Sequence, residues 1–274
     1  MATYCVKVNY LIAGQGKKQP RFCRRLKNAA NSEERRMKKI DAHAHVGYFG
    51  SWSDCGLTAD EMSVEMKSYN IEKSVISYMD NDVTLEALER HPEIFCALAW
   101  ENPYEPGAAD DLARRVEKQG FSGLKLHPLF NAFTANDAVV YPLMDMARAK
   151  SLPVFIHCGH PPFSLPWSIA QLADVYPDVR IVMVHMGHGH GVYIQASIDM
   201  AVKYDNLWLE TSGQPMHFKI KEAYHKVGHD RVFWGSDAPF HHYAVEILRT
   251  QVSGLSERQL EDVFYNNISR FMKI

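Results

Sequence analysis

Short apolar segments alternate with longer amphipathic segments from about residue 39 to the C-terminus. The apolar segments are rich in β-branched and aromatic residues and are followed by turn residues, which is typical of buried strands. We expect strands over residues 39–47, 74–79, 94–100, 121–127, 153–157, 180–185, 207–211 and 231–237. Strand and helix alternate throughout, which predicts a parallel sheet with helices outside it. In a chain of 274 residues, this order predicts a single-domain α/β fold, the (β/α)₈ or TIM barrel.

The first expected strand, residues 39–47, alternates small apolar residues with residues that can bind a metal. Because neighbouring side chains of a strand point to opposite faces, Asp41, His43 and His45 share one face. Two imidazoles at this spacing can hold a single cation, and neutral imidazole is a good ligand for zinc and related metals. A polar strand end with two solvated histidines is the alternative interpretation of this segment alone.

Four later apolar segments also end in a titratable side chain followed by a turn. They end at Lys125 and His127, at His157, at His185 and at Asp237. Side chains at the C-terminal ends of parallel barrel strands converge on one point, where the loops leave room for a ligand. The repeated ending therefore predicts one site that is built from five strands.

This set of strand ends resembles the amidohydrolase superfamily, in particular its amidohydrolase-related branch. That branch contains short metal-dependent hydrolases and non-oxidative decarboxylases of unsaturated or aromatic carboxylates. The resemblance runs from about Met37 to the C-terminus and includes the closing segment 266–271, which is similar to the final helix of the family. It implies a metal-dependent enzyme and a homodimer.

Three imidazoles and one carboxylate form a plausible set of ligands for one divalent ion: His43, His45, His157 and Asp237. The resemblance implies the same four residues. Zn²⁺ is expected first, with Mn²⁺ or Fe²⁺ as alternatives, because nitrogen and oxygen donors do not separate these metals. A bound zinc ion can bring the pKa of its water to about 7, and Asp237 would also be catalytic by orienting that water. The alternative role of Asp237 is to cap a helix ahead of Pro239.

His185 is expected to be the general acid and base, because imidazole has an ordinary pKa near 6.5. Ligation of a metal and a purely structural role are its alternatives. Lys125 and His127 share a strand face and are expected to bind the substrate, Lys125 as an ammonium that pairs with a carboxylate. The segment 123–128 also resembles the lysine motif of the binuclear hydrolases. In that alternative, a carbamylated Lys125 would bridge two metals and His185 would join the second; plain barrel packing is the third interpretation.

Loops at the same end of the expected barrel offer weaker candidates. Trp52 and His188 are expected to contact the substrate, although loop aromatics often pack and loop histidines are often solvated. Aromatic residues that could enclose a substrate are Phe130, Phe133 and Phe163. Thr211 and Ser212 follow the seventh strand and are candidates for orienting the substrate or supporting the site.

Charge is unevenly distributed along the chain. Residues 1–39 hold eleven Lys or Arg and two acidic residues, so they carry +9 and the remainder carries −11. A basic segment can indicate nucleic acid, an anionic membrane surface or a transit peptide. It has no clear amphipathic period and no signal-peptide apolar block, and the acidic remainder does not favour nucleic acid. We therefore expect residues 1–36 to be an extension outside a catalytic barrel of residues 37–274, with no nucleic-acid or membrane partner.

Two further properties complete the expectation. No apolar run approaches the ~18 residues that a membrane-spanning helix needs. Five cysteines without a Cys-x-x-Cys pair favour reduced thiols in a cytoplasmic protein. We expect a metal-dependent hydrolase of an amide, ester or lactone in a small substrate, with a non-oxidative decarboxylase as the alternative. A barrel that has lost catalysis and only binds a ligand is a rival of another class.

Overall fold

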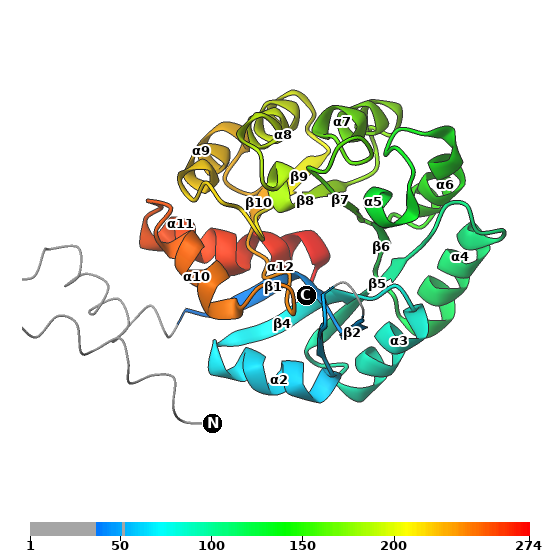
Figure 1. Ribbon diagram of the computed structural model, residues 1–274, viewed down its shortest axis with the longest axis horizontal. Helices are drawn as coiled ribbons and strands as arrows, with labels where there is room; N and C mark the ends of the chain where they lie inside the picture. The colour runs from blue at the N-terminus through cyan, green and yellow to red at the C-terminus, as the bar shows by residue number, and fades with distance from the viewer. Residues whose placement is uncertain (1–36, 51–52) are drawn as a thin grey trace, which may run out of the picture. The chain divides into compact units, whose positions relative to one another are not determined.

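The computed structural model describes residues 37–50 and 53–274, and within them eight parallel strands form a barrel surrounded by helices (Figure 1). The strands follow one another around the barrel in chain order: β1 (Lys39–His45), β4 (Ile71–Ser77), β5 (Phe95–Trp100), β6 (Gly123–Leu126), β7 (Val154–His157), β8 (Ile181–Val184), β9 (Leu207–Glu210) and β10 (Val232–Phe233). The predicted TIM barrel is thus confirmed. The expected extension, residues 1–36, and the candidate Trp52 lie outside the described residues.

Helices fill the connections between the strands. The longer ones are α2 (Ala59–Ser68), α3 (Asn81–Arg90), α4 (Ala108–Gln119), α6 (Tyr141–Ala149), α7 (Pro166–Val175), α8 (Gly191–Lys203), α9 (Phe218–Val227) and α10 (Tyr243–Gln251). Shorter helices are α5 (Pro128–Asn131), α11 (Glu257–Glu261) and α12 (Asn267–Met272). A capping box begins α2, where Thr58 and Glu61 exchange side-chain and backbone hydrogen bonds. No helix in the described part of the chain is long and apolar enough to span a membrane.

The barrel closes where β1 meets the segment that follows β10. The backbone N–H of Asp237 donates to the carbonyl of His43 (2.8 Å), and the N–H of His45 donates to the carbonyl of Ala238 (2.7 Å). These bonds continue the parallel pairing of the strands around the last gap in the sheet. They also bring a residue from the end of the chain beside the two histidines of β1.

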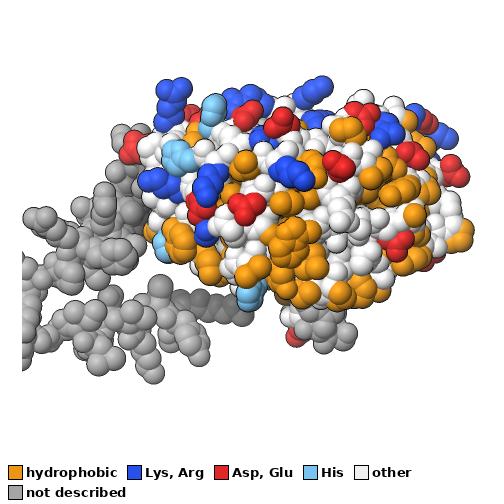
Figure 2. Space-filling view, turned by 90° about the horizontal axis from the view of Figure 1, so that it is seen from above, with side chains coloured by type: hydrophobic (Ala, Val, Ile, Leu, Met, Phe, Trp, Pro, Cys, Tyr) orange, Lys and Arg blue, Asp and Glu red, His pale blue; other side chains and the backbone are white. Residues whose placement is uncertain are grey.

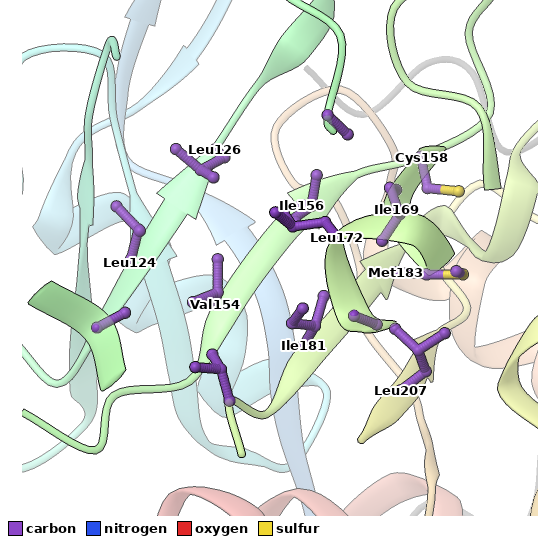
Figure 3. Close-up of a cluster of buried hydrophobic side chains, with 14 of the residues drawn as sticks. Leu124, Leu126, Val154, Ile156, Cys158, Ile169, Leu172, Ile181, Met183 and Leu207 are labelled. Carbon is purple, nitrogen blue, oxygen red and sulfur yellow. The ribbon is translucent and has the colours of Figure 1, made fainter. Parts of the chain in front are cut away.

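The larger core cluster lies between the strands and the surrounding helices (Figure 3). Leu126, Ile156 and Met183 come from neighbouring strands and pack with Ile169 and Leu172 of α7, and all five are almost completely buried. Burial of this apolar surface, at about 25 cal/mol per Å², is the main force that holds the helices on the barrel. Cys158 lies in the same cluster.

A second cluster joins the strands to the last helix, α12. The ring centroid of Phe271 lies 6.1 Å from that of Phe155 and 5.0 Å from that of Phe233. Phe155 precedes His157 by two positions in β7, so it points to the same side one layer closer to the strand's start. The closing helix therefore packs on the N-terminal ends of the strands and leaves their C-terminal ends for the site.

A short hairpin lies between β1 and α2. The loop after β1 contains an antiparallel hairpin of β2 (Gly47–Phe49) and β3 (Cys55–Leu57). Phe49 is 1% exposed, because the hairpin turns its ring inward against Phe240 at 4.6 Å between centroids. The hairpin therefore brings Phe49 into contact with a residue from near the end of the chain.

Acidic and basic side chains are interspersed on the face seen in Figure 2, with apolar side chains between them. Exposed apolar residues of the described chain include Val245, Leu248 and Val252 on and just after α10. On this face, the charge of the described residues is not gathered into a patch of one sign.

Candidate active site

Side chains from several strands meet at the C-terminal end of the barrel, as the sequence predicts. They come from β1, β6, β7 and the segments after β6, β8 and β10, and all are buried: His43, His45, Lys125, His127, His157, His185 and Asp237. So many titratable groups in one buried place are characteristic of a functional site, since burying a polar group is costly unless it is paired.

The carboxylate of Asp237 is the centre of this group. Its Oδ1 lies 3.4 Å from Nε2 of His43 and 3.3 Å from Nε2 of His45. His43, His185 and Asp237 each offer a ligand atom, and the three atoms lie within 4.8 Å of one another. Imidazole nitrogens and a carboxylate oxygen suit Zn²⁺, Mn²⁺ or Fe²⁺. A divalent metal site is therefore plausible here, with His185 close enough to belong to it.

The protonation states of these groups also fit a metal. Burial lowers the pKa of both His43 and His185 well below 6.5, so both imidazoles are neutral. Burial alone would raise the pKa of Asp237, but the surrounding imidazoles His185 and His43 hold it well below 3.8. Neutral imidazole and ionised carboxylate are the forms that bind a metal. The donor set therefore needs no proton loss before it can accept a cation.

His157 lies in the site but has another neighbour. Its ring centroid is 4.8 Å from that of His185, while its Nε2 lies 2.7 Å from Nδ1 of His160. His160 comes from the loop three residues later, and burial lowers its pKa below 6.5. The three-residue group at Asp237 does not include His157. The structure thus brings His43, His45 and Asp237 together and leaves Nε2 of His157 hydrogen-bonded to a loop histidine.

Lys125 is completely buried in the barrel interior. Its Nζ lies 3.4 Å from Nε2 of His43 and 5.8 Å from the ring centroid of Trp100. Burial lowers its pKa to about 8, against the opposing attraction of Asp237 and Glu210. At neutral pH the side chain is therefore mostly an ammonium that faces the proposed metal ligands.

A wall of parallel rings borders the site. His127 stacks on Trp100, with centroids 5.0 Å apart and planes 3° apart, and on Phe130 at 4.1 Å and 14°. The ring centroid of His127 also lies 4.0 Å from that of His157. Its Nδ1 accepts a hydrogen bond from the backbone N–H of Phe130 (3.2 Å), which fixes the ring. Such a wall can bind a flat ligand by offset stacking.

The loop candidates differ in how close they come to the site. His188 lies close to the site, because its ring centroid is 5.2 Å from that of His185 and 4.5 Å from that of His160. Burial lowers the pKa of His188 to about 4, so it is neutral. Phe133 is 1% exposed and belongs to the core between strands and helices, so it packs rather than encloses a substrate. 

Among the residues of the site with unusual backbone conformations are His185 and Asp237. His185 has φ 69° and Asp237 has φ 56°, in the left-handed region that residues other than glycine rarely adopt. A backbone hydrogen bond holds each of them. The N–H of His185 donates to Oε2 of Glu210 (3.1 Å), and the N–H of Asp237 donates to the carbonyl of His43. Residues held in this way are found mainly at functional sites.

Two buried carboxylates, Asp41 and Glu210, support the residues of the site. Asp41 accepts hydrogen bonds from the backbone N–H of Ser236 (2.8 Å), the hydroxyl of Ser236 (2.5 Å) and the N–H of His43 (3.1 Å). It therefore fixes β1 against the segment that carries Asp237. Glu210, at the end of β9, is fully buried and accepts hydrogen bonds from the hydroxyl of Ser212 and the backbone N–H of His185. In the sequence, the position of Glu210 near the end of an expected strand is the signal that could have identified it.

Similarity to known proteins extends over most of the chain. A profile of the amidohydrolase family matches residues 40–274 of the chain. The chain is also similar to a γ-resorcylate decarboxylase from Polaromonas sp. (strain JS666 / ATCC BAA-500), with 24% identity over 71% of this chain and 75% of that relative.

Solved structures share the fold. A 5-carboxyvanillate decarboxylase from Novosphingobium aromaticivorans DSM 12444, complexed with manganese and 4-hydroxy-3-methoxy-5-nitrobenzoic acid, aligns with a TM-score of 0.69 and 15% identity over 86% of this chain and 96% of that chain. A probable 2-pyrone-4,6-dicarboxylic acid hydrolase from Acinetobacter baumannii aligns with a TM-score of 0.70 and 17% identity over 87% of this chain and 100% of that chain. At such low identity the likeness shows a common fold.

Proposed function

The chain belongs to the amidohydrolase family, and on this premise we propose that it is a metal-dependent decarboxylase of a small unsaturated or aromatic carboxylate. The similarity to a γ-resorcylate decarboxylase over three quarters of that relative's length carries this choice. It favours the alternative of the sequence analysis over the hydrolase that was expected first. The wall of parallel rings beside the buried carboxylate and imidazoles supports a flat, unsaturated substrate.

One divalent ion would be held by His43, His45, His157 and Asp237. The positions of the first two around Asp237 support this set, and the proximity of His185 makes it the alternative fourth ligand to His157. The manganese complex of a related fold argues for testing Mn²⁺ beside Zn²⁺. When bound, the ion would polarise a substrate oxygen and so stabilise negative charge that develops on the substrate.

Lys125 would bind a carboxylate or ionised hydroxyl of the substrate as an ammonium. Its Nζ lies 3.4 Å from Nε2 of His43, and burial strengthens the attraction between opposite charges. Phe130, whose ring is stacked on that of His127, would in turn stack on one face of the substrate. These contacts hold the carboxylated carbon beside His185, and His188 would add a contact on the same side.

The chemical step exchanges a carboxylate for a hydrogen. The carbon–carbon bond to the carboxylate breaks, its electron pair stays on the substrate carbon, and CO₂ leaves. His185 would deliver the proton that takes up this pair, after accepting it on its neutral imidazole. Asp237 would stabilise the imidazolium that exists during the transfer. No oxidant or reductant is needed, because one proton is consumed for each CO₂ released.

A panel of ¹³C-carboxyl-labelled hydroxybenzoates and unsaturated acids, together with amides, esters and lactones of similar size, tests the proposal. Protein loaded with Mn²⁺ or Zn²⁺ is expected to release labelled CO₂ from at least one acid, while the His185→Asn variant releases none. Hydrolysis of an amide, ester or lactone without CO₂ release from any acid would overturn the decarboxylase assignment. Tight binding of a carboxylate without turnover by metal-loaded protein would favour the non-catalytic barrel.

A further inference from the structure

Nδ1 of the His185 imidazole lies within hydrogen-bond distance of two oxygen atoms of Ser212. The hydroxyl oxygen of Ser212 lies 2.9 Å from this nitrogen, and the backbone carbonyl oxygen of Ser212 lies 3.3 Å from it. A carbonyl oxygen can only accept a hydrogen bond. The contact to the carbonyl therefore requires a proton on Nδ1.

The hydroxyl of Ser212 supports the same assignment. Its oxygen lies 2.8 Å from Oε2 of Glu210, and the two carboxyl oxygens of Glu210 each accept a backbone N–H group. Burial raises the pKa of this carboxyl to about 8, and in its ionised form the carboxylate can only accept. A hydroxyl has one proton to donate, so when it donates to Glu210 its oxygen faces Nδ1 of His185 as an acceptor. Both oxygens of Ser212 then accept from the same N–H group.

Glu210 is held so that it can direct this hydroxyl. Its carboxylate also accepts the backbone N–H groups of Ser212 (2.5 Å) and His185 (3.1 Å), so three donors surround it. A Cβ atom at position 235 would collide with Oε1 of Glu210 and lie 3.1 Å from the backbone nitrogen of His43. Gly235 therefore leaves the space that the carboxylate occupies between β9 and β1.

We propose that Ser212 is the positioning residue that holds His185 in its Nδ1–H tautomer, and that Glu210 sets the direction of the Ser212 hydroxyl. The tautomer leaves the lone pair on Nε2, the nitrogen that faces away from Ser212. Resting on the proposed function, this means that Nε2 is ready to accept the proton that decarboxylation consumes. The arrangement has the same logic as other sites in which a fixed partner on one ring nitrogen sets the chemistry of the other.

Nuclear magnetic resonance of protein labelled with ¹⁵N in its histidines tests the tautomer directly. The two-bond and three-bond proton–nitrogen correlations distinguish Nδ1–H from Nε2–H imidazole, and the spectrum of His185→Asn identifies the signals of His185. The variants are Ser212→Ala, Ser212→Thr as the version that keeps a hydroxyl, and Ser253→Ala as the control. Ser253 is a buried serine after α10 whose hydroxyl forms no hydrogen bond with the described residues.

Wild-type protein and Ser253→Ala are expected to show His185 as Nδ1–H. In Ser212→Ala the Nε2–H form should gain population, and kcat should fall by roughly 10- to 100-fold with little change in KM or bound metal, as is typical when a supporting hydrogen bond is removed. Ser212→Thr should restore both. An Nε2–H signal in wild-type protein would overturn the proposal whatever the enzyme does. If the tautomer is Nδ1–H and no CO₂ is released, the proposed function fails and this inference stands.

Discussion

The Nζ atom of Lys125 lies 3.4 Å from Nε2 of His43, and the same imidazole nitrogen lies 3.4 Å from Oδ1 of Asp237. An ammonium, an imidazole and a carboxylate thus share one buried place at the end of the barrel. Burial disfavours the charged form of the lysine, and the carboxylate of Asp237 partly offsets this effect. Because the pKa of Lys125 is lowered to about 8, its charge changes just above neutral pH.

The first prediction concerns this charge. The pKa of Lys125 is lowered to about 8, so the ammonium is present below that pH and is lost as pH rises through it. If the ammonium binds the substrate carboxylate, KM should rise above pH 8. Lys125→Met should raise KM by roughly 10- to 100-fold at pH 7, the loss expected for a hydrogen bond to a charged group, and should remove the pH dependence. Steady-state kinetics between pH 6 and pH 10 measure both effects.

Lys125→Arg is the matched control, because its side chain stays charged throughout this range. It should show no rise of KM near pH 8. A bicarbonate-dependent second metal in wild-type protein, lost in Lys125→Met, would contradict the ammonium role and indicate the carbamylated lysine instead.

The second prediction separates the two candidate fourth ligands. If His157 binds the metal, His157→Ala should lose the ion, and His160→Ala should weaken metal binding by roughly 10- to 100-fold because His160 hydrogen-bonds to Nε2 of His157. His185→Ala should keep the ion but lose turnover. Elemental analysis of protein dialysed against limiting Mn²⁺ or Zn²⁺ gives the answer. Loss of metal from His185→Ala, with retention in His157→Ala, would exchange the roles of these two residues.

The third prediction tests the stacking wall. Phe130 is 38% exposed and stacks on His127, so its ring is available to a substrate at the mouth of the site. Phe130→Ala should raise KM for an aromatic carboxylate by about 2- to 10-fold, which corresponds to the ~0.5–1.5 kcal/mol of an aromatic pair. Phe218→Ala removes an exposed ring at the start of α9 and should leave KM unchanged. An equal rise for both variants would argue against a specific stacking role.

The fourth prediction concerns closure of the barrel. Asp41 accepts three hydrogen bonds that join β1 to the segment carrying Asp237. Asp41→Asn can keep an oxygen on the two backbone N–H groups but places an NH₂ group opposite the hydroxyl of Ser236, which should lower the free energy of unfolding by about 1–3 kcal/mol and weaken metal binding. Urea unfolding and metal titration measure the two effects. Asp205→Asn changes a fully exposed aspartate and should change neither; wild-type stability in Asp41→Asn would contradict the supporting role.

Much of this architecture could be predicted from the sequence. The barrel follows from the alternation of strands and helices, and the residues at the strand ends follow from the geometry of parallel strands. His43, His45 and Asp237 come together as expected because β1 and the segment after β10 are hydrogen-bonded neighbours. These features depend on local pattern and on topology, which the order of residues determines.

Features that depend on loop conformation could not be predicted. The hydrogen bond between His157 and His160 requires a particular path of the loop after β7, and the contact of His185 with Ser212 requires positive φ at His185. The burial of Phe49 depends on Phe240, which lies almost two hundred positions away in the chain. Tertiary contacts of this kind leave no periodic signal in the sequence.

The central claim is that the enzyme replaces a carboxylate by a proton without oxidation. The most direct measurement is the reaction in D₂O of a ¹³C-carboxyl-labelled substrate from the panel with metal-loaded protein, followed by mass spectrometry. We expect labelled CO₂ together with a product that carries deuterium at the carbon that lost the carboxylate, and neither with His185→Asn. A product that retains the labelled carboxylate and gains oxygen from water would contradict it and identify a hydrolase.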